Sequence, residues 1–252
     1  MKKQNKKQFL ILIMAVIAIG FTSCNKPKTE KKTTEKKIVT KTIKKEKVKV
    51  EKKGNMEKTV DSSKMMMKEG VAYEQGSTIP FNGNIVIKYK SGKKKIVMSY
   101  KNGIANGDRE LFYENGNKME KLFMKDGKTD GLFTGWHENG QKKQEVIFKN
   151  GKQNGVFRSW YKDGAKKTEE TYVDGKLDGK SIGWYPNGKK KGEGSFKDGK
   201  RVGQYTMWYP NGNKKEEGSF KDGKLDGKLT AWSQDGKNSK VAVFKDGKPV
   251  TK

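Results

Sequence analysis

The chain has 252 residues, of which 31% are hydrophobic and 34% charged, and its formal net charge is +28 at pH 7. This balance excludes a thick single core and favours an extended structure with a polar surface. Because Cys24 is the only cysteine and His137 the only histidine, an intrachain disulfide and metal clusters of His and Cys are also excluded. We therefore expect no metal and no cofactor.

The first 23 residues have the features of a secretory signal peptide. Four lysines within the first seven residues precede an apolar run from Phe9 to Ile19, which is too short to span a bilayer comfortably as a helix. The tetrapeptide Phe21-Thr22-Ser23-Cys24 resembles the lipobox of bacterial lipoproteins, although that family more often has Leu at the position of Phe21. The resemblance implies cleavage before Cys24, lipidation of this cysteine, and anchoring to a membrane of the bacterial cell envelope.

Residues 24–60 are predicted to form a disordered tether. Between Asn25 and Val60 there are 14 lysines and 5 glutamates but no aromatic residue, so the segment buries too little apolar surface to offset the entropy of ordering. Residues 61–82 follow, and we expect them to form an N-terminal cap on the repeats described next.

From residue 83 to residue 250 the sequence repeats seven times with a period of 24 residues, and residues 251–252 form a tail. One glycine column is Gly92, Gly116, Gly140, Gly164, Gly188, Gly212 and Gly236, and a second is Gly103, Gly127, Gly151, Gly175, Gly199, Gly223 and Gly247. A fixed period of this length predicts a repeat architecture, in which each unit buries its apolar face only against its neighbours.

Each repeat is predicted to contain two short strands and two turns. In residues 179–202, Asn187-Gly188 lies between two segments that carry aromatic residues, which predicts a two-residue type I′ hairpin turn. The stretch from Asp198 to Lys200 is predicted to form a second, longer turn. The predicted fold is therefore all-β: an extended, single-layer antiparallel meander of stacked β-hairpins.

The predicted register separates two faces of this sheet. With Asn187-Gly188 as the loop, Trp184 faces Lys191, and the same spacing recurs along the chain. Five tryptophans (Trp136, Trp160, Trp184, Trp208 and Trp232) then face Lys143, Lys167, Lys191, Lys215 and Ser239. This row either binds a partner or only covers its face of the sheet. The opposite, packed face is predicted to carry a tyrosine column, in which His137 takes one place, and a phenylalanine column.

The repeated pattern resembles the variant MORN repeat family. It reads aromatic-Tyr-x-Asn-Gly, then lysines, then Phe-Lys-Asp/Asn-Gly-Lys-x-x-Gly, and it covers about residues 81–250. The resemblance implies a twisted sheet of stacked β-hairpins. Bacterial members are commonly labelled YwqK family antitoxins, the immunity partners of secreted toxins, and others carry a kinase label. No kinase-like glycine-rich loop or catalytic loop is found in the sequence, so we expect no enzyme and no catalytic residue.

We expect a non-enzymatic, lipid-anchored envelope scaffold that binds a protein partner, in an antitoxin-like role, through the tryptophan and lysine row. The alternative is a module that binds a glycan, the cell wall or another anionic polymer, since the positive charge favours acidic partners. Nucleic acid is not an expected partner. Open sheet edges at both ends would also permit end-to-end self-association.

Overall fold

The computed structural model describes residues 58–250, and nearly all regular structure in this part of the chain is β-strand. The predicted signal peptide, Cys24 and most of the predicted tether lie outside the described residues, as does the tail at 251–252. Within residues 58–250, no helix has the length and apolar character needed to cross a membrane.

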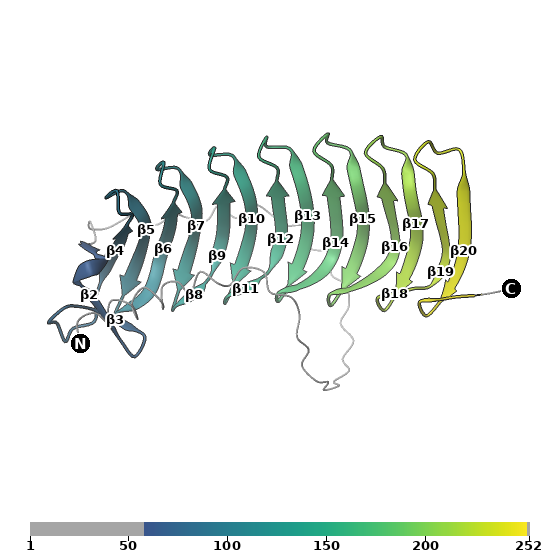
Figure 1. Cartoon of the computed structure of the whole chain (residues 1–252). Helices are drawn as coiled ribbons and strands as arrows, with labels where there is room; N and C mark the ends of the chain where they lie inside the picture. Colours follow the sequence, from purple (N-terminus) through teal and green to yellow (C-terminus); the bar gives the residue numbers. More distant parts are fainter. Residues whose placement is uncertain (1–57, 251–252) are drawn as a thin grey trace, which may run out of the picture. The chain divides into compact units, whose positions relative to one another are not determined.

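Seven β-hairpins follow one another along a 19-stranded sheet, which confirms the predicted all-β meander of stacked hairpins (Figure 1). The hairpins are β4–β5, β6–β7, β9–β10, β12–β13, β14–β15, β16–β17 and β19–β20. The strands are β1 (Thr59–Asp61), β2 (Met65–Lys68), β3 (Val71–Glu74), β4 (Gly83–Lys88), β5 (Lys94–Lys101), β6 (Ile104–Phe112), β7 (Lys118–Lys125), β8 (Lys128–Thr129), β9 (Gly131–Trp136), β10 (Lys142–Lys149), β11 (Lys152–Gln153), β12 (Gly155–Trp160), β13 (Lys166–Val173), β14 (Lys176–Trp184), β15 (Lys190–Lys197), β16 (Lys200–Trp208), β17 (Lys214–Lys221), β18 (Lys224–Leu225), β19 (Gly227–Trp232), β20 (Ser239–Lys245) and β21 (Lys248–Pro249).

Residues 58–82 cover the N-terminal end of this sheet. Strand β1, which begins inside the segment expected to be tether, pairs in parallel with the edge strand β4. A 3₁₀ turn (Ser62–Lys64) and the separate hairpin β2–β3 follow, and Met65, Ala72 and Phe81 are buried. One of the two edges expected to be open for self-association is therefore paired with β1.

The turn at Asn187-Gly188 differs from the predicted type I′ turn. Only Gly188 has a positive φ, 79°, and its N–H donates to the Tyr185 carbonyl at 2.9 Å. The Tyr185 N–H donates to the Lys189 carbonyl, which closes a three-residue loop that ends in a glycine bulge. The Asn187 carboxamide oxygen accepts a hydrogen bond from the Lys189 N–H at 3.1 Å. Because only Asn or Asp can form this local bond so readily, these residues are favoured before the glycine of the turn.

The type I′ conformation occurs instead at the second turn. Asp198 and Gly199 have φ values of 49° and 80°, and Lys197 pairs directly with Lys200 across the loop. Both central residues of a type I′ turn need positive φ, and the same conformation recurs at the equivalent Asn-Gly and Asp-Gly dipeptides of the other hairpins. The predicted long and short turns are therefore interchanged, because an Asn-Gly or Asp-Gly dipeptide occurs at both positions.

The two faces of the sheet differ in packing. We call one the phenylalanine face, after the column Tyr100, Met124, Phe148, Tyr172, Phe196, Phe220 and Phe244, and the other the tryptophan face. Buried strand side chains lie almost entirely on the phenylalanine face: Ile85, Ile96, Met98, Tyr100, Leu111, Leu122, Met124, Val146 and Tyr205. All but Tyr205 come from β4 to β10, so the core of the second half of the sheet is thinner.

Candidate functional site

The lysine opposite each tryptophan is the one that precedes the predicted lysine. Trp184 pairs with Lys190, whereas Gly183 pairs with Gly192, so Lys191 is the extra residue of a β-bulge. The same shift pairs Trp136 with Lys142, Trp160 with Lys166 and Trp208 with Lys214, while Trp232 pairs with Ser239 as predicted. The prediction that Lys143, Lys167, Lys191 and Lys215 oppose the tryptophans was therefore wrong.

The lysines of these pairs also contact the next tryptophan along the sheet. The Lys142 ammonium lies 5.7 Å from the centre of the Trp160 ring, and the equivalent distances for Lys166 to Trp184, Lys190 to Trp208 and Lys214 to Trp232 are 5.7, 5.6 and 5.7 Å. Each such contact contributes on the order of 0.5–1 kcal/mol at an exposed site. We call this alternation the Trp–Lys ladder: Trp136, Lys142, Trp160, Lys166, Trp184, Lys190, Trp208, Lys214 and Trp232.

The displaced lysines lie over tyrosines instead. Lys167, Lys191 and Lys215 are 5.6 to 5.8 Å from the ring centres of Tyr161, Tyr185 and Tyr209, and Lys143 is exposed. The tryptophans themselves are half-buried. Except for Lys143, both sets of lysines therefore lie against aromatic rings, but only the first set belongs to the tryptophan row.

Carboxylates partly neutralise the Trp–Lys ladder. The Lys142 ammonium is 3.4 Å from Glu145, the Lys190 ammonium is 2.7 Å from Glu193, and Lys214 forms the equivalent pair with Glu217. These pairs are solvent-exposed, so each contributes little to stability. Their consequence is electrostatic, because the ladder is not a continuous cationic surface.

The tyrosine column links consecutive hairpins by hydrogen bonds that the sequence analysis did not predict. The Tyr161 hydroxyl donates to the Trp184 carbonyl at 2.9 Å, 23 residues later. Tyr89, Tyr113, Tyr185 and Tyr209 form the same bond with Phe112, Trp136, Trp208 and Trp232. His137 takes the tyrosine's place, with its Nε2 atom 3.1 Å from the Trp160 carbonyl. This supports a structural role for His137.

Three exposed apolar side chains lie beside one another on the tryptophan face. Phe123, Leu132 and Ile147 are 42%, 51% and 48% exposed, and they come from the adjacent strands β7, β9 and β10. Leu132 pairs with Ile147, and strand alternation places both on the same face as Trp136. We call these three residues the apolar patch; it was not predicted from the sequence, because its residues fall outside the aromatic columns.

Four segments of the repeat region match the family described as MORN repeat variant: residues 105–126, 129–150, 177–198 and 201–222. They coincide with the hairpins β6–β7, β9–β10, β14–β15 and β16–β17. The repeats of this chain are variant MORN repeats. The hairpins β4–β5, β12–β13 and β19–β20 lie outside the matched segments but have the same positive-φ positions. The loop of β19–β20 is one residue longer, because the Ser233 N–H donates to the Asn238 carbonyl. A comparison with curated proteins finds no match.

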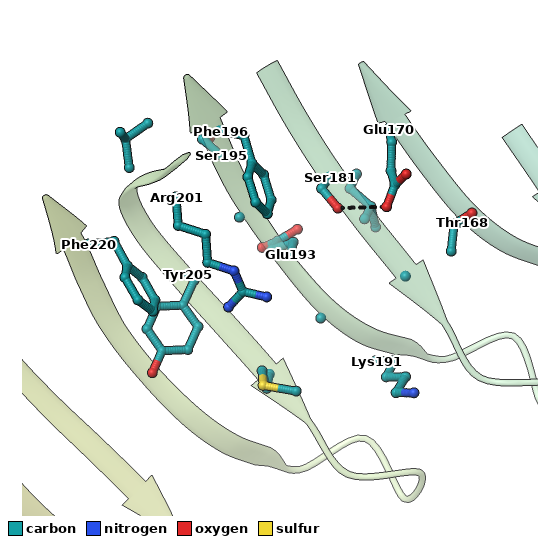
Figure 2. A pocket seen from close by; sticks show the side chains of 16 residues that line it. Thr168, Glu170, Ser181, Lys191, Glu193, Ser195, Phe196, Arg201, Tyr205 and Phe220 are labelled. Carbon is teal, nitrogen blue, oxygen red and sulfur yellow. Dashed lines mark hydrogen bonds between the residues drawn. The ribbon is translucent and has the colours of Figure 1, made fainter. Parts of the chain in front are cut away.

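The MORN repeats β14–β15 and β16–β17, together with β13, surround a hollow of about 350 Å³ on the phenylalanine face (Figure 2). Its floor is formed by positions with little or no side chain: Ser181, Gly183, Gly192 and Gly194. Its walls carry Thr168, Glu170, Tyr205, Met207, Phe196, Arg201 and Phe220, and Lys191 also lines it. The hollow was not predicted from the sequence.

Hydroxyl groups bind the carboxylates on this face of the MORN sheet. The Tyr172 hydroxyl donates to Glu170 at 3.0 Å, and the Tyr205 hydroxyl donates to Glu216. Burial, together with the neighbouring carboxylate, raises the pKa of both tyrosines. The hydroxyls therefore remain neutral hydrogen-bond donors at physiological pH.

The acidic residues at the turns of the MORN repeats have a structural role. Asp178 accepts a hydrogen bond from the Lys197 ammonium at 2.8 Å and one from the Asp198 N–H at 3.4 Å, and these bonds lower its pKa. Asp226 forms equivalent contacts with Lys245 and Asp246. In the part of the chain that the structure describes, no three His, Cys, Asp or Glu side chains are grouped closely enough to hold a metal ion.

Proposed function

We propose that the protein is a non-enzymatic scaffold, anchored in the bacterial cell envelope by lipid on Cys24, that binds a protein partner through the tryptophan face. The single observation that carries this proposal is the apolar patch beside the Trp–Lys ladder. Exposed apolar side chains next to half-buried aromatics are typical of protein-binding surfaces. The antitoxin-like version, in which the partner is a toxin, rests only on the family resemblance.

Charge favours a protein over an acidic polymer on this face. Three of the four ladder lysines are paired with glutamates, and the apolar patch offers nothing to a polyanion. The acidic polymer or glycan remains the second candidate because of the type I′ turns at one end of the hairpins. There Lys149 lies directly opposite Lys152, and Lys221 opposite Lys224. Like charges in these positions repel each other, and a bound polyanion would relieve the repulsion.

Site-specific photo-crosslinking in the producing cells tests the proposed binding face. A photoreactive residue at Leu132 is expected to form one discrete protein adduct, whereas the same residue at Val243 is expected to form none. Val243 is a matched control, because it is 49% exposed and lies on the same face in β20. The partner identified in this way should bind the purified protein, and Leu132→Asp should weaken binding at least about tenfold while Val243→Asp does not. Identical adducts from both positions, or no adduct from Leu132, would contradict the proposal.

The proposed anchor is tested separately. Cys24→Ala should abolish labelling by a lipid precursor and release the protein from the membrane fraction. The unchanged chain should be labelled and should stay in the membrane fraction. Labelling that persists in the Cys24→Ala variant would sink the lipoprotein assignment without affecting the binding face.

A further inference from the structure

Two of the three glycines in the floor of the hollow are not required by the backbone. Neither Gly183 nor Gly192 has a positive φ, and a Cβ added at either position would meet no atom closer than 3.7 Å. In the first hairpin the equivalent pair is Ile87 and Ile96, which face each other in the same register. The sheet therefore accommodates large side chains at these positions, and the space over β14 and β15 is left open by residue choice alone.

An arginine with free donors lines this open space. Only three of the 57 basic residues are arginine, and each has a different environment. Arg109 is buried and Arg158 pairs with Glu169 at 3.0 Å. The Arg201 guanidinium is exposed, lies 5.6 Å from the Phe196 ring and 5.5 Å from the Phe220 ring, and forms no ion pair within residues 58–250.

The Arg201 guanidinium carbon lies over both phenylalanine rings, and its N–H groups form no hydrogen bond within residues 58–250. A planar guanidinium fork matches a carboxylate with two parallel hydrogen bonds, which an ammonium group cannot do. In a chain that otherwise uses lysine almost throughout, arginine at this position is therefore suited to bind a carboxylate. Figure 2 shows Arg201 among Phe196, Tyr205 and Phe220 on the wall of the hollow.

We propose that the hollow binds an acidic segment of a polypeptide, with an Asp or Glu carboxylate on Arg201 and the peptide backbone over the glycine floor. The site goes beyond the proposed function because it lies on the phenylalanine face, whereas the apolar patch lies on the tryptophan face and on other strands. The absence of side chains at Gly183, Gly192 and Gly194 allows a backbone to approach closely. Glu170, on the opposite wall, has carboxylate oxygens that accept N–H groups of such a segment.

A polypeptide fits this site better than a sugar does. Recognition of a sugar ring commonly uses an open aromatic face, but Phe220 is flanked by Arg201 and by Tyr205, whose ring centre is 4.9 Å away. Tyr205 itself is only 6% exposed. The walls therefore carry a charged group, but they do not present an open aromatic ring on which a sugar could stack.

The proposal is tested by selecting peptides that bind the full chain, purified in detergent, from a phage-displayed library of random 12-residue peptides. Enriched peptides should share an Asp or Glu among small or apolar residues. Arg201→Gln should weaken their binding at least about tenfold, the loss expected for a charge-assisted bidentate pair, and Arg201→Lys should restore only part of it. Lys200→Gln is the matched control, since it removes the same charge from the adjacent position of β16 and should leave binding unchanged.

A second variant tests the hollow itself. Gly183→Ile combined with Gly192→Ile copies the Ile87 and Ile96 pair of the first hairpin, so it should fold, which a thermal melt followed by circular dichroism verifies. It should abolish peptide binding. Peptides that bind this variant or Arg201→Gln as tightly as the unchanged chain would overturn the proposal, and so would the failure to enrich acidic peptides.

Two further measurements separate the possible outcomes. If a hyaluronan oligosaccharide binds in an Arg201-dependent way and no peptide does, the occupant is an acidic glycan and the polypeptide proposal is wrong. Leu132→Asp should leave binding of the selected peptides unchanged. The two proposals can therefore be refuted independently: a negative result for peptide binding in the hollow does not affect the crosslinking result at Leu132, and a negative crosslinking result does not affect the hollow.

Discussion

The Tyr185 hydroxyl donates a 2.8 Å hydrogen bond to the backbone carbonyl of Trp208, 23 residues later. At the other end of the same strands, the Gly199 N–H donates to the Leu177 carbonyl at 2.7 Å. Each hairpin is thus bonded to a neighbouring part of the sheet at both ends, in addition to the strand ladder between them. The 24-residue period keeps these bonds in step, because an insertion would move the tyrosine out of reach of its carbonyl.

Removing one of these tyrosine hydroxyls should weaken the sheet measurably. Tyr185→Phe keeps the ring under Lys191 but deletes the donor to Trp208, so we expect the free energy of unfolding to fall by about 1 kcal/mol. Urea denaturation of the two proteins measures the difference. Tyr73→Phe is the control, because the Tyr73 hydroxyl forms no side-chain hydrogen bond within residues 58–250. Equal losses from both substitutions would show that the interhairpin bond contributes nothing.

The corrected register predicts which lysine is coupled to tryptophan. A double-mutant cycle with Lys190→Met and Trp208→Leu should give a coupling energy of about 0.5–1 kcal/mol, since the two side chains are in cation–π contact. The same cycle with Lys191→Met should give a coupling near zero, because Lys191 lies over Tyr185. The opposite ranking would restore the register expected from the sequence.

The sequence was sufficient to predict the hairpins and the two faces because both depend on local spacing. Away from the turns the register follows directly from the 24-residue period, and Gly183 pairs with Gly192 as that spacing requires. The bulge at Lys191, which recurs in six of the seven hairpins, was not predictable in this way, because it leaves the 24-residue period unchanged. The order of the turn types was also not predicted. An Asn-Gly or Asp-Gly dipeptide occurs at both turns, so the dipeptide alone does not show which turn contains the side-chain bond seen at Asn187.

The candidate binding surfaces were less predictable than the fold. The hollow and the apolar patch are departures from the repeat rather than parts of it, so averaging the columns conceals them. A position-by-position comparison would have found the hollow, because Gly183 and Gly192 replace Ile87 and Ile96. The apolar patch lies on the adjacent strands β7, β9 and β10, and the exposed fractions that distinguish its side chains come only from the structure.

The type I′ turns can be tested by substitution at Asp198. Its φ of 49° is tolerated by Asn, which has φ values of 49° and 51° at the equivalent residues Asn102 and Asn150. Asp198→Asn should therefore leave the free energy of unfolding within about 0.5 kcal/mol, whereas Asp198→Ala should lower it by about 1–2 kcal/mol. Urea denaturation of both variants checks this ranking, and a fully tolerated alanine would contradict the left-handed conformation.

Tyr100 should make stability decline in alkaline solution. Burial raises its pKa to about 12, from an ordinary value near 10. The unfolded chain ionises first, so this contribution is complete below about pH 10 and is lost as the pH rises toward 12, by about 2–3 kcal/mol in total. The difference in unfolding free energy between the unchanged chain and Tyr100→Phe, measured between pH 8 and pH 11.5, should shift in favour of Tyr100→Phe as the pH rises. Parallel profiles would show that Tyr100 titrates normally.

Arg109 is predicted to destabilise the sheet. Its side chain is 2% exposed, pairs across the strands with Met98 and Leu122, and has Nε and Nη2 atoms without a hydrogen-bond partner within residues 58–250. Burial lowers its pKa, and the Glu120 carboxylate opposes this effect only in part. Replacing a buried, unsatisfied charge with an apolar group of similar length removes a desolvation cost. Arg109→Met should therefore raise the free energy of unfolding by about 1–3 kcal/mol.

The control for Arg109 is Arg158→Met, which breaks an exposed ion pair with Glu169 and should change stability by no more than about 0.5 kcal/mol. Both variants remove one arginine and one positive charge, so a difference between them isolates the effect of burial. Thermal and urea unfolding give the comparison. A loss of stability in Arg109→Met would show that the buried guanidinium makes a favourable interaction on the phenylalanine face, and the assignment of Arg109 as an unsatisfied charge would then be wrong.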